Sequence, residues 1–131
     1  MRNRLDIDTV RAAVLAPGQA WTTLEFVPAI GSTNDRASEL ARRCGEPGLV
    51  VLTDHQTGGR GRLGRGWVVP DRASVAVSAV VPVAQVAAAG WVPLLAGLAL
   101  ARAIRRVTAA AGRELTPRLK WPNDVLLAED G

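Results

Sequence analysis

A run of 29 residues without a charge, residues 73–101, constrains this chain more than any other feature of its sequence. Its length alone would suffice for a membrane-spanning helix, which needs about 20 apolar residues. Its composition argues against such a helix, because the run is rich in alanine and is interrupted by Pro82, Gln85, Gly90 and Pro93. We therefore expect no membrane span, but a buried strand at residues 74–82 and a core helix at residues 94–111.

The remaining composition is that of one globular domain. The chain has 131 residues, of which 48% are hydrophobic, so disorder is not expected. Its 16 basic residues, 15 of them arginine, outnumber the 12 acidic residues by only four, which is far from a polycation. One cysteine, Cys44, excludes an internal disulfide and a cysteine-rich zinc site, and one histidine, His55, excludes a multi-histidine metal site.

The spacing of apolar residues predicts strands and helices in alternation. Residues 21–30 contain β-forming residues around a proline, which is typical of a strand with an irregular end. Ser32 and Asp35 have the spacing of a helix-capping box, and Gly45 marks the end of the helix that follows. Cys44 falls on the apolar face of this helix, so we expect a buried structural thiol.

The second half of the pattern continues this alternation. Residues 49–53 form an unbroken apolar run, typical of a central strand, and a polar loop follows at residues 54–66. The helix at residues 94–111 is expected to be buried early, with Leu95 and Leu98 inward, and exposed late. Residues 118–121 and 125–128 predict two further strands.

The loop after the central strand carries the chemistry. Residues 58–66 contain five glycines and three arginines. Glycine lets backbone amides approach a ligand closely, and the arginine side chain binds carboxylate or phosphate through two parallel hydrogen bonds. Ligands of α/β sheets usually bind where strands end. The sequence therefore predicts a site for a small anionic ligand at the end of the central strand.

Other interpretations of this loop are less well supported. Gly59, Gly61 and Gly64 match the dinucleotide-binding pattern, but the following residues look extended rather than helical, and the expected acidic residue further on is missing. A Walker loop is absent, because the sequence has no Gly-Lys-Ser or Gly-Lys-Thr. A nucleic-acid-binding arm would need aromatic residues for base stacking, and only Trp67 is near. This arm and a disordered surface loop are kept as alternatives.

Three motifs together resemble those of biotin protein ligases. They read GSTN at residues 31–34, HQT with GRGRLGRGW at residues 55–67, and KWPND at residues 120–124. The resemblance implies an α+β fold with a mixed β-sheet and helices packed on one face, similar to class II aminoacyl-tRNA synthetases. The resemblance extends over residues 21–131, which it implies to be the catalytic domain, and residues 1–20 form an extension before it. This extension is too short for a helix-turn-helix domain, which indicates the monofunctional, non-repressor class.

The resemblance implies a two-step reaction. Biotin reacts with ATP to give biotinyl-5′-AMP and pyrophosphate, and biotin then passes to a lysine of the biotin carboxyl carrier domain of acetyl-CoA carboxylase or a related carboxylase. ATP and biotin are the implied substrates, and Mg²⁺ is a further implied cofactor. The resemblance also implies a cytoplasmic location and no nucleic-acid or membrane partner. A lipoate ligase of the same fold is the alternative within this group.

The resemblance also assigns roles to residues. It implies that Arg60 and Arg62 are catalytic. The residues implied to bind biotin are Ser32, Thr33, Asn34, Gln56, Arg60, Gly61 and Arg62. The residues implied to bind the nucleotide or the adenylate are Arg62, Arg65, Trp67, Asn123 and Asp124, and no metal ligand of the protein is implied. We expect His55 to stabilise the loop, and we do not expect Lys120 to be the catalytic lysine.

The C-terminal residues suggest an incomplete enzyme. Asp130 and Gly131 form a dipeptide typical of a hairpin turn, and no returning strand follows. The family also has a further lysine shortly after the KWPND motif, beyond the last residue of this sequence. We therefore expect this chain to be the front part of a longer enzyme and nearly inactive by itself. A frayed natural terminus is the alternative.

Overall fold

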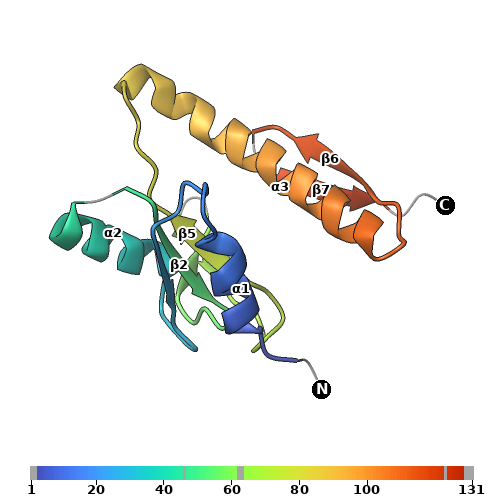
Figure 1. The fold of residues 1–131 in the computed structure, drawn as a ribbon, viewed down its shortest axis with the longest axis horizontal. Coiled ribbons are helices and arrows are strands. Elements are labelled where there is room, and N and C mark those ends of the chain that lie inside the picture. The colour runs from blue at the N-terminus through green and yellow to red at the C-terminus, as the bar shows by residue number, and fades with distance from the viewer. Residues whose placement is uncertain (1–2, 46, 62–63, 123, 129–131) are drawn as a thin grey trace. The chain divides into compact units, whose positions relative to one another are not determined.

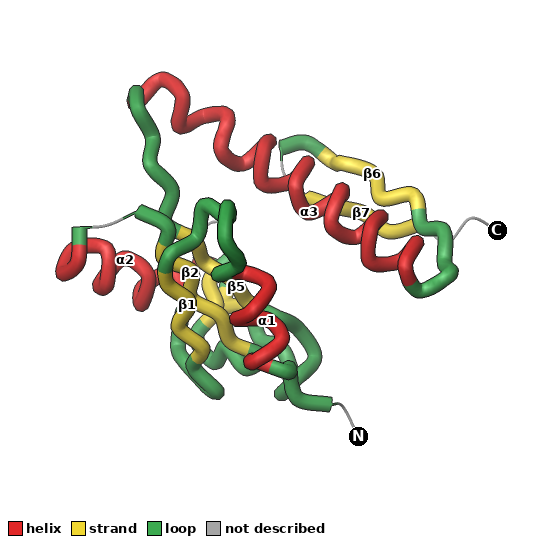
Figure 2. Tube along the Cα trace, viewed as in Figure 1, coloured by secondary structure: helices red, strands yellow, loops and turns green. Residues whose placement is uncertain are grey.

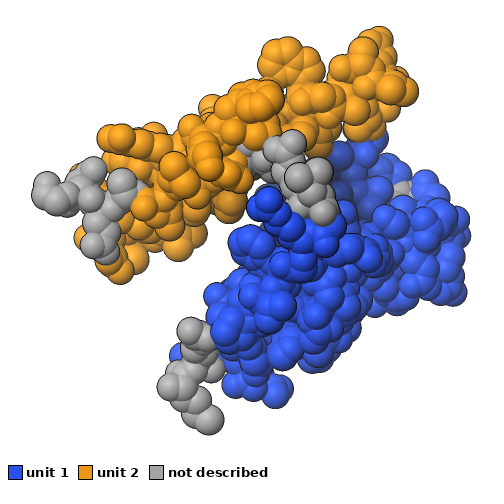
Figure 3. Space-filling view, turned by 180° about the vertical axis from the view of Figure 1, so that it is seen from behind, with its two compact units in different colours: residues 1–82 blue, residues 83–131 orange. Residues whose placement is uncertain are grey.

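The structure is a computed structural model that describes residues 3–45, 47–61, 64–122 and 124–128. The chain forms two compact units, Met1–Pro82 and Val83–Gly131, which Figure 3 distinguishes by colour. The elements of unit 1 are α1 (Ile7–Val14), β1 (Thr23–Phe26), α2 (Thr33–Cys44), β2 (Leu49–Thr53), β3 (Gly59–Arg60), β4 (Gly66–Trp67) and β5 (Ala76–Ala79). Those of unit 2 are the 3₁₀-helix η2 (Val86–Trp91), α3 (Val92–Ala110), β6 (Thr116–Lys120) and β7 (Asp124–Ala128).

A mixed three-stranded sheet in the order β1-β2-β5 forms the centre of unit 1 (Figure 1). Strand β2 is parallel to β1, with Leu24 opposite Val50, and antiparallel to β5, with Val51 opposite Ser78. All five residues of β2 are buried, as its unbroken apolar sequence predicts. The expected mixed sheet and central strand are confirmed.

The two helices of unit 1 cover opposite faces of this sheet (Figure 2). Because alternate side chains of a strand point to opposite faces, Val50 and Leu52 face one helix while Leu49 and Val51 face the other. Helix α1 packs against the first pair, and Ala37 of α2 packs against the second. The expectation of helices on one face therefore does not hold in unit 1, since a strand buried on both sides needs cover on both.

Helix α2 begins and ends where the sequence predicts. The Oγ atom of Ser32 accepts a hydrogen bond from the backbone N–H of Asp35 at 3.3 Å, and Gly45 ends the helix in the left-handed region with φ of 68°. The prediction for Cys44 is wrong, because this side chain is exposed. Burial decreases along the helix from Ala37, which is buried, to Leu40, which is half-buried, to Cys44 at the end of the helix, which is exposed.

Two other expectations in unit 1 need correction. The predicted buried strand at residues 74–82 is the shorter strand β5, which is only half-buried, and Val77 in it is 57% exposed. Within the described sheet β5 pairs with β2 alone, so one of its edges lacks a neighbouring strand. The predicted polar loop at residues 54–66 contains β3 and the start of β4, which pair as a short antiparallel hairpin.

Unit 2 contains a hairpin and a long helix. Strands β6 and β7 pair from Thr116 opposite Ala128 to Lys120 opposite Asp124, which confirms the two strands predicted around the Trp-Pro dipeptide. Helix α3 packs against this hairpin, and its two buried residues are Gly97 and Ala101. The least exposed side of α3 runs along Leu94, Gly97, Ala101, Ile104 and Thr108. The prediction of an early buried half is wrong, since Leu95 is 60% exposed.

By length and composition alone, the helical segment Val86–Ala110 could cross a membrane, and 11% of its most apolar part is buried. Core helices of globular proteins pass the same test. Arg102, Arg105 and Arg106 lie in the second half of the segment, where a span would place charges in the bilayer at high cost. The absence of a membrane span stays a prediction.

Candidate functional site

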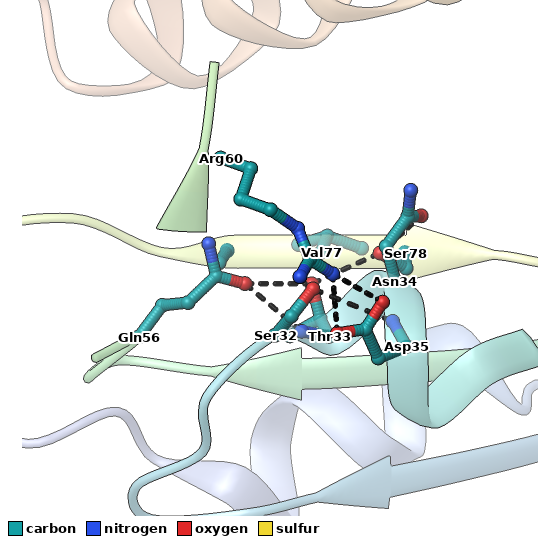
Figure 4. Close-up of a pocket in the computed structure, with 9 residues that line it drawn as sticks. Ser32, Thr33, Asn34, Asp35, Gln56, Arg60, Val77 and Ser78 are labelled. Carbon is teal, nitrogen blue, oxygen red and sulfur yellow. Dashed lines mark hydrogen bonds and ion pairs between the residues drawn. The ribbon is translucent and has the colours of Figure 1, made fainter. Parts of the chain in front are cut away.

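A pocket of about 340 Å³ lies between the start of α2, strand β5 and the loop that follows β2 (Figure 4). Its walls are mostly polar. It is lined by Ser32, Thr33, Asn34, Asp35, Gln56, Arg60, Ala76, Val77 and Ser78. Five of the residues that the motifs predict for ligand binding, separated by up to 28 positions in the sequence, are thus brought to one place.

The pairing of two loops brings these residues together. The segment after β1 runs parallel to the segment after β2, with a β-bridge between Ile30 and Gln56. The backbone N–H of Thr57 donates to the carbonyl of Ile30 at 2.8 Å, and that of Gly58 donates to the carbonyl of Gly31 at 2.7 Å. A Cβ atom at Gly58 would lie 3.1 Å from the same carbonyl oxygen, so a larger residue would crowd this contact.

Gln56 is tied to the start of α2. Its Oε1 atom accepts hydrogen bonds from the backbone N–H of Thr33 at 2.9 Å and from the Thr33 hydroxyl at 3.2 Å. The Oγ atom of Ser78 lies 2.9 Å from Thr33 Oγ1 and 3.1 Å from Asn34 Oδ1. Thr33 is only 3% exposed, so this network forms the buried floor of the pocket.

This network leaves hydrogen-bond donors for a ligand. The amide oxygens of Gln56 and Asn34 accept bonds within the protein, whereas their NH₂ groups donate to no other residue in the described part of the chain. A carboxamide NH₂ group is a donor only. Together with Arg60, the pocket therefore suits a ligand rich in acceptors, such as a carboxylate or a ureido carbonyl.

Arg60 reaches the pocket from β3 (Figure 4). Its Nη2 atom contacts both carboxylate oxygens of Asp35, which lies in the first turn of α2. Both side chains are more than 60% exposed, so solvent reaches this ion pair. The backbone before Arg60 is fixed by a close approach, because a Cβ atom at Gly59 would lie 2.9 Å from the carbonyl oxygen of Trp67.

The other predicted site residues lie elsewhere or are not described. Gly61 and Arg65 belong to the β3–β4 hairpin, where the backbone N–H of Gly61 donates to the carbonyl of Arg65 at 2.7 Å. Trp67 in β4 is 63% exposed and does not line the pocket. Asp124 lies in unit 2, with an Oδ2 atom 3.6 Å from Lys120 Nζ. The predictions for Arg62 and Asn123 fall outside the described residues.

Sequence reasoning missed part of the pocket wall. Asp35 carries a signal, since the capping spacing singles it out, but that spacing does not predict its ion pair with Arg60. Ser78 and its neighbours in β5 have no local signal. They line the pocket because the antiparallel register places Ser78 opposite Val51.

A second group of contacts closes the base of the loop of glycines and arginines at residues 58–66. His55 Nδ1 lies 2.8 Å from Asp71 Oδ1, and the backbone N–H of Arg72 donates to the carbonyl of Asp54 at 3.1 Å. The hydrogen bond from His55 is the main cause that lowers the pKa of Asp71 from its ordinary value, and the charge of Arg72 adds to it. His55 thus joins the two ends of the loop, as expected for a structural residue.

We find no group of three or more His, Cys, Asp or Glu side chains that could hold a metal ion in the described part of the chain.

Residues 26–130 match the biotin/lipoate A/B protein ligase family. The chain belongs to this family.

Two proteins similar to this chain are named biotin–[acetyl-CoA-carboxylase] ligases. The chain is 40% identical over 129 residues to the biotin–[acetyl-CoA-carboxylase] ligase of Mycobacterium tuberculosis, which covers 96% of this chain and 48% of that protein. It is 39% identical over 100 residues to the ligase of the same name from Paracoccus denitrificans, covering 73% of this chain and 38% of that protein. The chain therefore spans about half, or less, of the length of the relatives that it matches.

A solved structure supports the fold. The biotin protein ligase from Aquifex aeolicus, in complex with biotin and ATP, matches 80% of this chain and 41% of its own chain, with a TM-score of 0.61 and 28% sequence identity. The predicted fold class, the α+β architecture of the biotin/lipoate ligase catalytic domain, is thereby confirmed.

Proposed function

We propose that this chain forms the biotin-binding part of an ATP-dependent biotin protein ligase. The observation that carries the proposal is the convergence of Ser32, Thr33, Asn34, Gln56 and Arg60 on one pocket. Two similar proteins that are named biotin ligases support the substrate class. A similar biotin protein ligase whose structure contains biotin and ATP supports it as well.

The first step joins two anions. A carboxylate oxygen of biotin attacks the α-phosphorus of ATP, the bond to the bridging oxygen breaks, and pyrophosphate leaves with the electron pair. Fixed cations and positioned donors offset the repulsion between the reacting groups and stabilise the charge of the transition state. Arg60, at the mouth of the pocket, would supply one such cation, and Arg62 is proposed as the second.

The second step transfers the acyl group. The amine of a carrier lysine attacks the acyl carbon of biotinyl-5′-AMP, an amide bond forms, AMP leaves, and the amine loses a proton. We propose that the carrier is the biotin carboxyl carrier domain of acetyl-CoA carboxylase or a related carboxylase. A cytoplasmic location and the absence of nucleic-acid and membrane partners belong to the same proposal.

The roles of the other residues follow the motifs. We propose that biotin is bound by Ser32, Thr33, Asn34, Gln56, Arg60, Gly61 and Arg62. The nucleotide or adenylate is bound by Arg62, Arg65, Trp67, Asn123 and Asp124. Mg²⁺ would enter with the phosphates of ATP, since it commonly binds through substrate oxygens, water and one or two carboxylates. We also propose that residues 21–131 belong to one catalytic domain, with residues 1–20 as an extension.

Exchange of labelled pyrophosphate into ATP tests the adenylation step. With the protein at its complete natural length, we expect exchange that requires biotin and Mg²⁺. Absence of biotin-dependent exchange would disprove the proposal.

A binding measurement separates biotin from lipoate. The pocket floor consists of Thr33, Ser78, Asn34 and Gln56, which suits the polar ureido ring of biotin better than an apolar dithiolane. Calorimetry with each acid should show binding of biotin and much weaker binding of lipoate. Preferential binding of lipoate would favour the other branch of the family.

A further inference from the structure

We propose that Asp35 competes with the substrate carboxylate for Arg60. The Asp35 carboxylate stays paired with Arg60 until an anionic ligand binds. The inference rests on the proposed function, because it concerns the same pocket and the same anionic substrate. It adds a positioning residue that controls how strongly the pocket selects a charged ligand.

The geometry shows the pairing directly (Figure 4). Asp35 comes from the first turn of α2 and Arg60 from β3, and both line the pocket. A single guanidinium nitrogen, Nη2, contacts both oxygens of Asp35. The Nε and Nη1 atoms of Arg60 donate to no residue in the described part of the chain. Asp35 thus offers Arg60 the type of group that a carboxylate substrate would offer.

The pairing is weak enough to exchange. The side chains are 62% and 63% exposed, and ion pairs at such positions contribute little because water and salt screen them. The other acidic residue of α2, Glu39, has its own partners, since it contacts Arg36 and Arg43 and does not line the pocket. An incoming carboxylate can therefore replace Asp35 on Arg60 at small cost, while the empty pocket stays electrically neutral.

This model predicts the effect of removing the Asp35 charge. In Asp35→Asn, Arg60 is free of its competitor, so biotin should bind about two- to fivefold more tightly, the range of an exposed ion pair. Biotin amide, a neutral analogue, should bind equally well to the altered and unaltered proteins. Asp35→Ser, which is also uncharged, should behave as Asp35→Asn does.

A double-mutant cycle with Arg60→Gln identifies the route of the effect. If Asp35 acts by occupying Arg60, then Asp35→Asn should leave the affinity for biotin unchanged in the Arg60→Gln background. Glu39→Gln, a loss of negative charge on the same helix, is the matched control and should not change biotin binding. Isothermal titration calorimetry of the complete-length protein supplies all the affinities at one salt concentration.

The outcomes separate this inference from the proposed function. If the unaltered protein binds biotin and Asp35→Asn binds it equally or more weakly, then Asp35 does not compete and the inference is wrong. Tighter binding that persists in the Arg60→Gln background, or that extends to biotin amide, would also overturn it. If the unaltered protein binds no biotin, the proposed function itself fails, and the inference fails with it.

Discussion

Gly59 lies where the backbone of β3 passes close to two other groups. A Cβ atom there would lie 2.8 Å from Gln56 Nε2 and 2.9 Å from the carbonyl oxygen of Trp67. We expect Gly59→Ala to destabilise the fold by about 1–3 kcal/mol, the usual cost of overpacking, and to weaken biotin binding because Gln56 must move. Chemical denaturation and calorimetry measure the two effects.

Gly66 in β4 offers the control for this prediction at the residue scale. Apart from its two neighbours in the sequence, no described residue has an atom within 4 Å of the position that its Cβ would occupy. Gly66→Ala should therefore leave both stability and biotin affinity nearly unchanged. Equal effects of the two substitutions would show that the close approach at Gly59 is not the cause.

At the scale of elements, the β3–β4 hairpin is held at its base by the contact between His55 and Asp71. The pKa of Asp71 lies below its ordinary value of 3.8, chiefly because of the hydrogen bond from His55. A carboxyl group with a lowered pKa stabilises the fold above its unfolded-state pKa, and this contribution is lost as the pH falls through the folded-state value. Asp71→Asn should therefore reduce stability at pH 5, and the difference from the unaltered protein should shrink as the pH falls below about 3.8.

Denaturant titrations between pH 2 and pH 5 follow this difference. Glu114→Gln is a suitable control, because it removes a carboxylate that makes no ion pair within the described residues. A difference between Asp71→Asn and the unaltered protein that stays constant down to pH 2 would contradict the proposed contact.

At the scale of the whole molecule, the length of the relatives bears on activity. The chain covers 48% of the M. tuberculosis ligase and 41% of the A. aeolicus ligase chain. Catalysis depends on all the positioned groups together, so the part of these relatives that the chain does not match is expected to matter for the rate. We expect these 131 residues by themselves to show much slower pyrophosphate exchange than a complete ligase such as the M. tuberculosis relative. Comparable turnover by the two would contradict this expectation.

Much of the fold was predictable because its signals are local. The start of α2 depends on the three-residue spacing between Ser32 and Asp35, and its end depends on the freedom of Gly45 to adopt a positive φ. The β6–β7 hairpin follows from two short strands around a tight turn. Burial was harder to predict, because an apolar face indicates that a residue can be buried but not whether a neighbour covers it. Cys44 and Leu95 were predicted to be buried for this reason, and both are exposed.

The motifs by themselves determined which residues could bind an acidic ligand, since the chemistry of glycine, arginine and amide side chains belongs to the residues. They also determined the family. Only the tertiary structure decided that Asp35 occupies Arg60 and that Ser78 supports Thr33. Those contacts join residues 25 and 45 positions apart. They depend on how strands pair and where a helix starts relative to a distant loop, and no local pattern of side chains carries that information.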